Sequence, residues 1–299
     1  MVNHEIDLHC MESSGHNMRD KSAYITILRA IGKVLPGDYA KTFFYLNFIK
    51  TPRKFLQLSI NSFYRMDHIY DVLKEFRKID GKFSILEFGV AGGVSFTKHL
   101  FATKYLNMSD RVMVYGFDTF EGMPEVVDNK NKDLIGNDDW VKGEFKGDYE
   151  KLIAYCESKY TNFQLYKGLF EDSLTPAVLE NLDKYQPILI WIDCDYYTST
   201  VSVFKKILRK IPNGCLIYFD ELDNINYGSK FTGEARFVHE INNNKFCEGI
   251  ELVLDTKLSL NSKRLYRFVN FQIPVRYKGL INIKPPDELR KRTTDSPLP

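Results

Sequence analysis

The amino-acid sequence predicts an α/β fold with a doubly wound, mostly parallel sheet of seven strands and a helical region ahead of it. Short apolar segments alternate with amphipathic segments from about residue 82 onward, a pattern typical of a parallel sheet covered by helices on both faces. A glycine-rich turn follows the first apolar segment, and acidic residues follow several others. In doubly wound sheets such strand ends line the ligand-binding crevice, so we expect the functional site there.

The strands and helices can be assigned in order along the chain. The expected strands cover residues 83–90, 111–118, 162–168, 187–193, 215–220, 249–255 and 264–271. The expected helices cover residues 92–106, 149–160, 174–185, 200–211 and 233–243. The strands are short apolar runs, and the last one alternates more between polar and apolar positions.

A helical accessory or lid region is expected at residues 21–80, before this alternation begins. Apolar residues recur near a period of 3.6 between Phe55 and Ile79, which predicts an amphipathic helix. Two interpretations fit: a packed accessory layer, or a lid that shapes a substrate cavity. Aromatic side chains of this region would suit a self-association surface in a homo-oligomer.

The remaining segments set the expected domain limits. Residues 1–20 are polar and show no clear period, so we expect a loose arm. Residues 120–148 form a long polar insertion, and long ordered loops are often functional lids. The Pro-rich, charged tail at residues 274–299 is expected to be partly disordered. Residues 81–273 are then the main domain.

Composition excludes several classes of protein. Lys and Arg number 41 and Asp and Glu 39, and this balance leaves no basic footprint for nucleic acid. The five cysteines are scattered without a zinc spacing, as expected of reduced thiols in a cytoplasmic protein. The N-terminus lacks the apolar segment of a secretory signal. No apolar run approaches the roughly 18 residues of a membrane span, so we expect none.

The glycine-rich turn reads EFGVAGG, with Glu87, Gly89, Gly92 and Gly93. Glycine allows a tight turn and a close approach to a ligand. The spacing G-x-x-G-G differs from the G-x-G-x-x-G of dinucleotide-binding proteins. The turn alone is therefore equally consistent with a ligand cradle and with an ordinary strand–helix turn.

Acidic residues at the next two strand ends would suit a nucleoside. Asp118 ends the second strand, where a carboxylate can accept both hydroxyl groups of a ribose. Glu171 and Asp172 follow the third strand, where they could meet an adenine edge or cap the next helix. The sequence has no P-loop, which argues against a phosphate-rich nucleotide.

Four more carboxylates follow the fourth and fifth strands: Asp193, Asp195, Asp220 and Glu221. These strand ends should be neighbours, and converging carboxylates repel one another unless a cation or a proton intervenes. Hard oxygen ligands select Mg²⁺, Mn²⁺ or Ca²⁺ rather than zinc. The alternative is helix capping, which is weaker at Asp220 and Glu221 because no evident helix follows them.

Six motifs occur in order: EFGVAGG, YGFDTFEGMPE, KGLFEDSL, IDCDYYTST, YFDEL and GEARFVHEI. Together they resemble the Rossmann-like class I S-adenosylmethionine-dependent methyltransferases. More closely, they resemble the macrocin O-methyltransferase family, whose studied members methylate sugar hydroxyls in antibiotic biosynthesis. The resemblance covers residues 83–254, and its most specific pieces are GFDTFEGMPE and the D-x-D-x-Y-x-S-T pattern that begins at Asp193.

The resemblance implies a binding site for S-adenosylmethionine. Glu87 and the glycine turn would cradle the methionine part of the cofactor, and Asp118 would hold the ribose. Glu171 or Asp172 would lie at the adenine. The full set of implied cofactor-binding residues is Glu87, Gly89, Ala91, Gly92, Gly93, Ser95, Asp118, Thr119, Glu171 and Asp172.

The resemblance also implies a Mg²⁺ or Mn²⁺ ion held by Asp193, Asp220 and Glu221. The ion would position the hydroxyl group of a small-molecule acceptor and lower its pKa. Asp193 or Asp195 would take the proton as the methyl group transfers. Glu221 stands where the family usually has a second aspartate, and Cys194 replaces a small residue.

Two other functions stay open. The methyl group could go to a phosphate-type oxygen, an amine or a phenol, because the acceptor side is the least transferable part of the resemblance. The chain could also be a cofactor-binding scaffold without turnover. Acidic residues at the ends of all the central strands argue against a scaffold, which would not need them.

Overall fold

The computed structural model describes residues 66–125, 141–223, 229–259 and 264–272, together with residues 30, 34, 35 and 40. The chain divides into two compact units, Met1–Tyr64 and Arg65–Pro299, and every element discussed below belongs to the second. The expected N-terminal arm, nearly all of the helical region up to residue 65, residues 126–140 of the insertion and the tail lie outside the described residues. The domain limits therefore stay a prediction.

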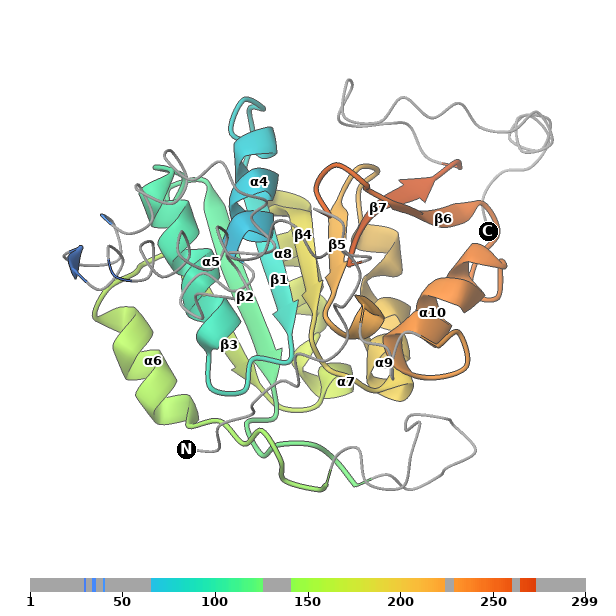
Figure 1. Ribbon diagram of the computed structural model, residues 1–299, viewed down its shortest axis with the longest axis horizontal. Coiled ribbons are helices and arrows are strands. Elements are labelled where there is room, and N and C mark those ends of the chain that lie inside the picture. Colours follow the sequence, from blue (N-terminus) through green and yellow to red (C-terminus); the bar gives the residue numbers. More distant parts are fainter. Residues whose placement is uncertain are drawn as a thin grey trace, which may run out of the picture. The chain divides into compact units, whose positions relative to one another are not determined.

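The second unit is built on a seven-stranded sheet in the order β3-β2-β1-β4-β5-β7-β6 (Figure 1). The first five strands pair in parallel, and β7 is antiparallel to β5 and β6. This confirms the predicted doubly wound, mostly parallel sheet. The strand order reverses between β1 and β4, which places the expected crevice at their carboxyl ends. The strands are β1 (Phe83–Phe88), β2 (Val112–Asp118), β3 (Phe163–Lys167), β4 (Gln186–Ile192), β5 (Leu216–Phe219), β6 (Ile250–Leu254) and β7 (Leu265–Asn270).

The helices follow the expected rhythm with one addition, the four-residue α7 between β3 and α8. Side-chain caps begin two of them: Asp148 accepts a hydrogen bond from the Lys151 N–H at 3.0 Å, and Thr175 one from the Val178 N–H at 3.3 Å. The α-helices are α4 (Met66–Phe76), α5 (Val94–Tyr105), α6 (Tyr149–Glu157), α7 (Phe170–Ser173), α8 (Pro176–Lys184), α9 (Tyr197–Ile207) and α10 (Gly233–Asn242). Two 3-10 helices are η3 (Leu208–Lys210) and η4 (Glu221–Asp223).

Both faces of the sheet are covered, which explains the nearly continuous apolar runs of its central strands. All six residues of β1 are buried. Alternate residues of β1 and β4 form one core with apolar residues of α8, α9 and α10. On the other face, His99 of α5 packs edge-on against Trp191 of β4, with ring centroids 4.9 Å apart. Figure 1 shows α4 and α5 in front of the sheet and α8 and α9 behind it. Among the described residues, none of the helices is both long and apolar enough to cross a bilayer.

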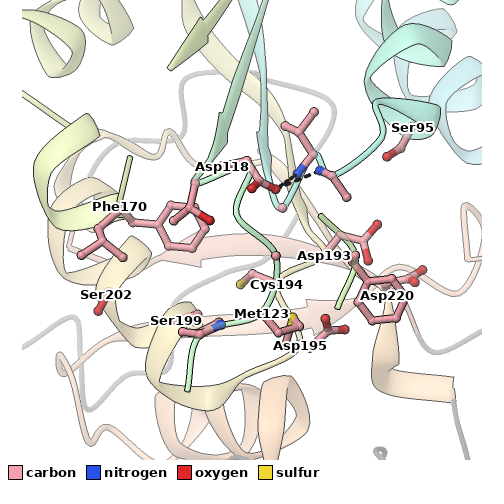
Figure 2. Close-up of a pocket in the computed structure, with 18 of the residues that line it drawn as sticks. Ser95, Asp118, Met123, Phe170, Asp193, Cys194, Asp195, Ser199, Ser202 and Asp220 are labelled. Carbon is pink, nitrogen blue, oxygen red and sulfur yellow. Dashed lines mark hydrogen bonds between the residues drawn. The ribbon is translucent and has the colours of Figure 1, made fainter. Parts of the chain in front are cut away.

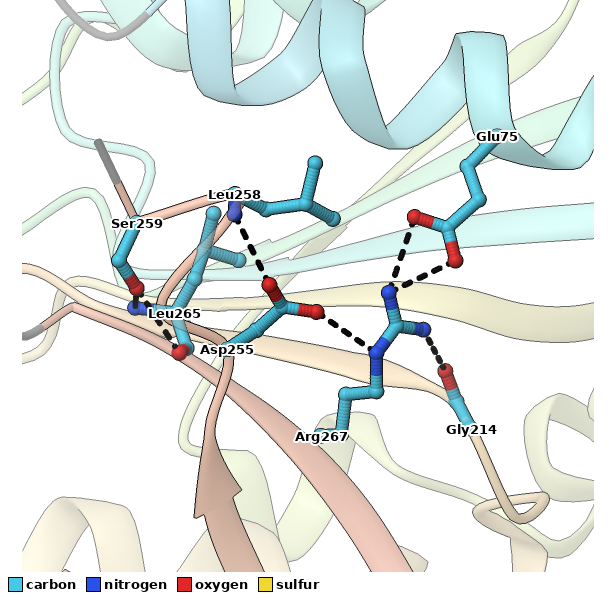
Figure 3. A network of polar contacts seen from close by, with 7 residues as sticks. All are labelled: Glu75, Gly214, Asp255, Leu258, Ser259, Leu265 and Arg267. Carbon is cyan, nitrogen blue, oxygen red and sulfur yellow. Dashed lines mark hydrogen bonds and ion pairs between the residues drawn. The ribbon is translucent and has the colours of Figure 1, made fainter. Parts of the chain in front are cut away.

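Arg267 of β7 joins the antiparallel part of the sheet to α4 (Figure 3). Its Nη2 lies 2.7 Å and 2.9 Å from the two carboxylate oxygens of Glu75 in α4. Its Nε lies 2.7 Å from Asp255 Oδ2 after β6. The three side chains are at most 18% exposed, so water screens these pairs only weakly.

We expect Arg267→Met to lower the free energy of unfolding by about 3 kcal/mol, because two poorly exposed carboxylates lose their cation. Urea denaturation measures the effect. Lys142→Met is the matched control, since it breaks an ion pair with Glu125 whose side chains are 70% and 69% exposed. That change should cost less than about 1 kcal/mol. Equal losses in the two variants would contradict the structural role of Arg267.

Candidate active site

A cavity of about 500 Å³ opens at the carboxyl ends of the five parallel strands. Its walls come from the segments that follow β1, β2, β3, β4 and β5 (Figure 2). Seven of the ten expected cofactor-binding residues line it, namely Gly89, Ala91, Gly92, Ser95, Asp118, Thr119 and Glu171. The four carboxylates expected at the metal and base positions also line it. The cavity thus brings most of the expected site together.

The glycines of the turn differ in what surrounds them. Gly89 has a φ of +91°, and a Cβ there would lie 1.9 Å from the carbonyl oxygen of Asp193. Gly89 therefore allows two strand ends to touch. Gly92 lines the cavity, and a Cβ there would meet nothing within 4 Å. Gly93 faces α6 instead, since its Cβ would lie 2.4 Å from Leu152.

Asp118 fixes the glycine turn against the end of β2. Its Oδ2 accepts hydrogen bonds from the N–H groups of Val90 at 2.7 Å and Ala91 at 2.8 Å (Figure 2). Its Oδ1 accepts one from the Phe120 N–H at 2.5 Å. Two carboxylate oxygens together offer about four acceptor sites, so capacity for a ribose hydroxyl group remains.

Glu87 lies behind the cavity rather than in it. The side chain is fully buried on the α5 face of β1, where Ser95 Oγ donates a hydrogen bond to Oε1 at 2.5 Å. His99 Nε2 lies 3.3 Å from Oε2. Burial, with a smaller contribution from Lys98, lowers the pKa of His99 to about 3, so this imidazole is neutral at pH 7. Ser95 is the member of this group that lines the cavity.

The wall after β3 contains Leu169, Phe170 and Glu171. Glu171 accepts a hydrogen bond from the Ser202 hydroxyl group of α9, and Phe170 packs edge-on against Phe88 with ring centroids 5.5 Å apart. Asp172 is not among the described residues that line the cavity. Sequence reasoning missed Leu169 and Phe170, because apolar residues at a strand end look like ordinary core residues.

Three carboxylates lie close enough to share a cation. One oxygen from each of Asp193, Asp195 and Glu221 lies within 4.8 Å of the others. Asp195 has a φ of +59°, in the left-handed region that favours glycine. Two other non-glycine residues with positive φ, Ala91 and Phe145, also line the cavity. Such backbone strain clusters at functional sites and persists where surrounding structure holds it.

Asp220, the third expected metal ligand, is engaged elsewhere. It is 4% exposed, and its Oδ1 accepts hydrogen bonds from the Tyr218 hydroxyl group at 2.8 Å and from Arg264 Nη1 at 2.6 Å. In the group of three carboxylates, Asp195 therefore stands where the sequence analysis expected Asp220. Cys194 lies between the two aspartates, and burial raises the pKa of its thiol well above the usual range, which makes it a poor nucleophile.

The sequence of the chain matches the family described as macrocin O-methyltransferase (TylF) over residues 55–247. No curated protein matches the chain. Among solved structures, the chain is similar to the calicheamicin methyltransferase CalS11, with 19% sequence identity and a TM-score of 0.50, over 86% of this chain and 94% of that chain.

Two further solved structures are more distant. The O-methyltransferase NovP is 16% identical with a TM-score of 0.46, over 69% of this chain and 79% of that chain. The mycinamycin-pathway methyltransferase MycE, in complex with Mg, SAH and mycinamycin VI, is 11% identical with a TM-score of 0.37, over 79% and 63% of the two chains. The family match and the CalS11 fold agree with the class I methyltransferase architecture expected from the motifs.

Proposed function

Because the chain belongs to the macrocin O-methyltransferase family, and is thus an S-adenosylmethionine-dependent O-methyltransferase, we propose that it methylates a hydroxyl group of a small polar acceptor. The acceptor is a sugar or another natural-product precursor, and a divalent cation assists the reaction. The observation that carries this proposal is the placement of three clustered carboxylates in the same cavity as the glycine turn.

The cofactor side of the cavity suits S-adenosylmethionine. Gly92 has no side chain, and a Cβ there would meet nothing within 4 Å, so a ligand can approach the backbone closely at this position. Asp118 would accept a hydrogen bond from one ribose hydroxyl group, and Glu171 and Phe170 would border the adenine. The bound cofactor supplies an electrophilic methyl group on a positively charged sulfonium.

The carboxylates of Asp193, Asp195 and Glu221 suit Mg²⁺ or Mn²⁺, since these hard cations prefer oxygen ligands. A cation held there would lower the pKa of the acceptor hydroxyl group. Oδ1 of Asp220 already accepts hydrogen bonds from Tyr218 and Arg264, whereas Asp195 belongs to the group of three carboxylates, so we place Asp195 in the ligand set beside Asp193 and Glu221.

Asp193 or Asp195 acts as the general base. The acceptor O–H bond breaks and the carboxylate takes the proton, while the acceptor oxygen forms a bond to the methyl carbon. The methyl group would come from the sulfonium of the bound cofactor, which would leave as a neutral thioether and so balance the transfer. Walls from five strand ends hold both reactants, and such positioning supplies much of the rate.

The described lining of the cavity contains no Lys, Arg or His side chain. Apart from the proposed divalent cation, a phosphate-type acceptor oxygen would meet the carboxylates of Asp193, Asp195, Asp220 and Glu221 with no protein cation to balance its charge. A neutral hydroxyl group avoids this repulsion. The cavity is also lined by hydroxyl-bearing residues of α9, namely Thr198, Ser199 and Ser202, which would suit a hydroxyl-rich acceptor.

Cytoplasmic location and self-association stay predictions.

Calorimetry with S-adenosylhomocysteine, with and without Mg²⁺, tests the proposal. We expect the protein to bind S-adenosylhomocysteine, and to bind Mg²⁺ at a site that Asp195→Asn weakens. Failure to bind S-adenosylhomocysteine would refute the methyltransferase assignment of this cavity. Binding without any response to Mg²⁺ or Mn²⁺ would refute only the role of the cation. A mass-resolved screen of sugar and glycoside acceptors then identifies the methylated hydroxyl group.

A further inference from the structure

The first turn of α10 contacts both loops that carry the clustered carboxylates. Gly233 begins the helix with a φ of +51°, and a Cβ there would lie 3.1 Å from the carbonyl oxygen of Asp195. The next residue, Glu234, accepts a hydrogen bond at Oε2 from the Glu221 N–H at 3.1 Å. Two adjacent residues therefore bridge the loop after β4 and the turn after β5.

The burial of Glu234 at this position is energetically unfavourable. Its side chain is 0% exposed, and Oε1 has no hydrogen-bond partner among the described residues. Burial, together with the nearby charges of Glu221 and Asp195, raises the pKa of Glu234 well above its usual range. Burying a carboxyl group with one oxygen unpartnered costs stability, and an apolar side chain would avoid that cost.

Glu234 does not line the cavity, so it has no direct contact with a ligand there. Its Oε2 accepts a hydrogen bond from the backbone N–H of Glu221, one of the three clustered carboxylates. The hydrogen bond ties the start of η4 to α10, and Gly233 in the same helical turn lies close to the Asp195 backbone, since an added Cβ would come within 3.1 Å of its carbonyl oxygen. The distance between Asp195 and Glu221 therefore depends on this turn of α10.

We infer that Glu234 is a positioning residue that holds Glu221 at cation-binding distance from Asp195 through the Glu221 N–H group. This inference rests on the proposed cation site. Partners that orient metal ligands from behind typically change metal affinity by about 10- to 100-fold when they are replaced. We expect a loss of cation affinity of that size when Glu234 is replaced. The affinity for the cofactor should change little, because residues at other strand ends form that part of the cavity.

The experiment compares wild type, Glu234→Gln and Glu234→Leu as full chains. Glutamine keeps a carbonyl oxygen that can accept from the Glu221 N–H, whereas leucine removes the acceptor and keeps a similar volume. Calorimetry measures affinity for Mn²⁺ and Mg²⁺ and, separately, for S-adenosylhomocysteine, and thermal melting checks that each variant folds. Glu234→Met is the substitute if leucine prevents folding, because methionine adapts to irregular space.

Glu234→Leu should bind the cation about 10- to 100-fold more weakly and bind S-adenosylhomocysteine as wild type does. Glu234→Gln should restore most of the cation affinity. Wild-type affinity in Glu234→Leu would overturn the inference and leave the proposed cation site intact. An equal loss in Glu234→Gln would also overturn it, since the acceptor oxygen would not be the cause. Absence of cation binding in wild type would instead remove the cation site itself, and the inference with it.

Discussion

Asp193→Asn is expected to lower the rate of methyl transfer by at least about 100-fold, while affinity for S-adenosylhomocysteine stays within a few-fold of wild type. Asparagine keeps the shape of the side chain but removes the charge that binds a cation and the basic oxygen that takes a proton. Asp193 belongs to the carboxylate group, whereas the glycine turn is held by the carboxylate of Asp118, without a contribution from the Asp193 side chain.

Single-turnover assays with mass detection of the methylated acceptor measure this effect. Asp183→Asn is the matched control. Asp183 lies in α8, its side chain is 62% exposed, and it forms an ion pair with Lys210. The activity of this variant should equal that of wild type. Asp195→Asn, measured across pH, separates the two carboxylates: loss of the basic residue should remove the acidic limb of the rate profile. Full activity of Asp193→Asn would show that its assignment as ligand and base is wrong.

Most of the sheet could be predicted from the sequence, because buried parallel strands are short apolar runs between amphipathic helices. The prediction also placed the carboxylates of Asp193 and Glu221 at adjoining strand ends, since strand order follows from the doubly wound pattern. The short helix α7 was missed. A helix of four residues is too short to show a 3.6-residue period.

The partners of the site residues could not be predicted in the same way. Arg264, which directly precedes β7, pairs with Asp220 from 44 positions later in the chain, and that contact depends on the antiparallel register of β7 beside β5. Nothing local in the sequence reveals this register. Glu234 looked like an ordinary polar residue at the start of a helix, and its burial follows from packing against η4. The burial of Glu87 against α5 was predictable in part, because side chains alternate along a strand and Glu87 lies between Leu86 and Phe88, which pack into the core on the other face of the sheet.

Gly89→Ala is expected to destabilise the fold by at least about 3 kcal/mol, or to prevent folding. Two costs combine. The φ of +91° is strained for any residue with a Cβ, and the new methyl group would lie 1.9 Å from the Asp193 carbonyl oxygen. The contacted atom is backbone, so no side-chain rotation relieves the clash, and the ends of β1 and β4 must separate.

Gly92→Ala is the control that separates the two uses of glycine in this turn. Its Cβ would meet nothing within 4 Å, so urea denaturation should place its stability within about 0.5 kcal/mol of wild type. Because Gly92 lines the cavity, the same variant should bind S-adenosylhomocysteine more weakly. Equal stability of Gly89→Ala and Gly92→Ala would contradict the backbone contact at Gly89. Unchanged affinity in Gly92→Ala would mean that the cofactor does not approach the turn there. Together the two variants assign one glycine to the junction of the strands and the other to the ligand.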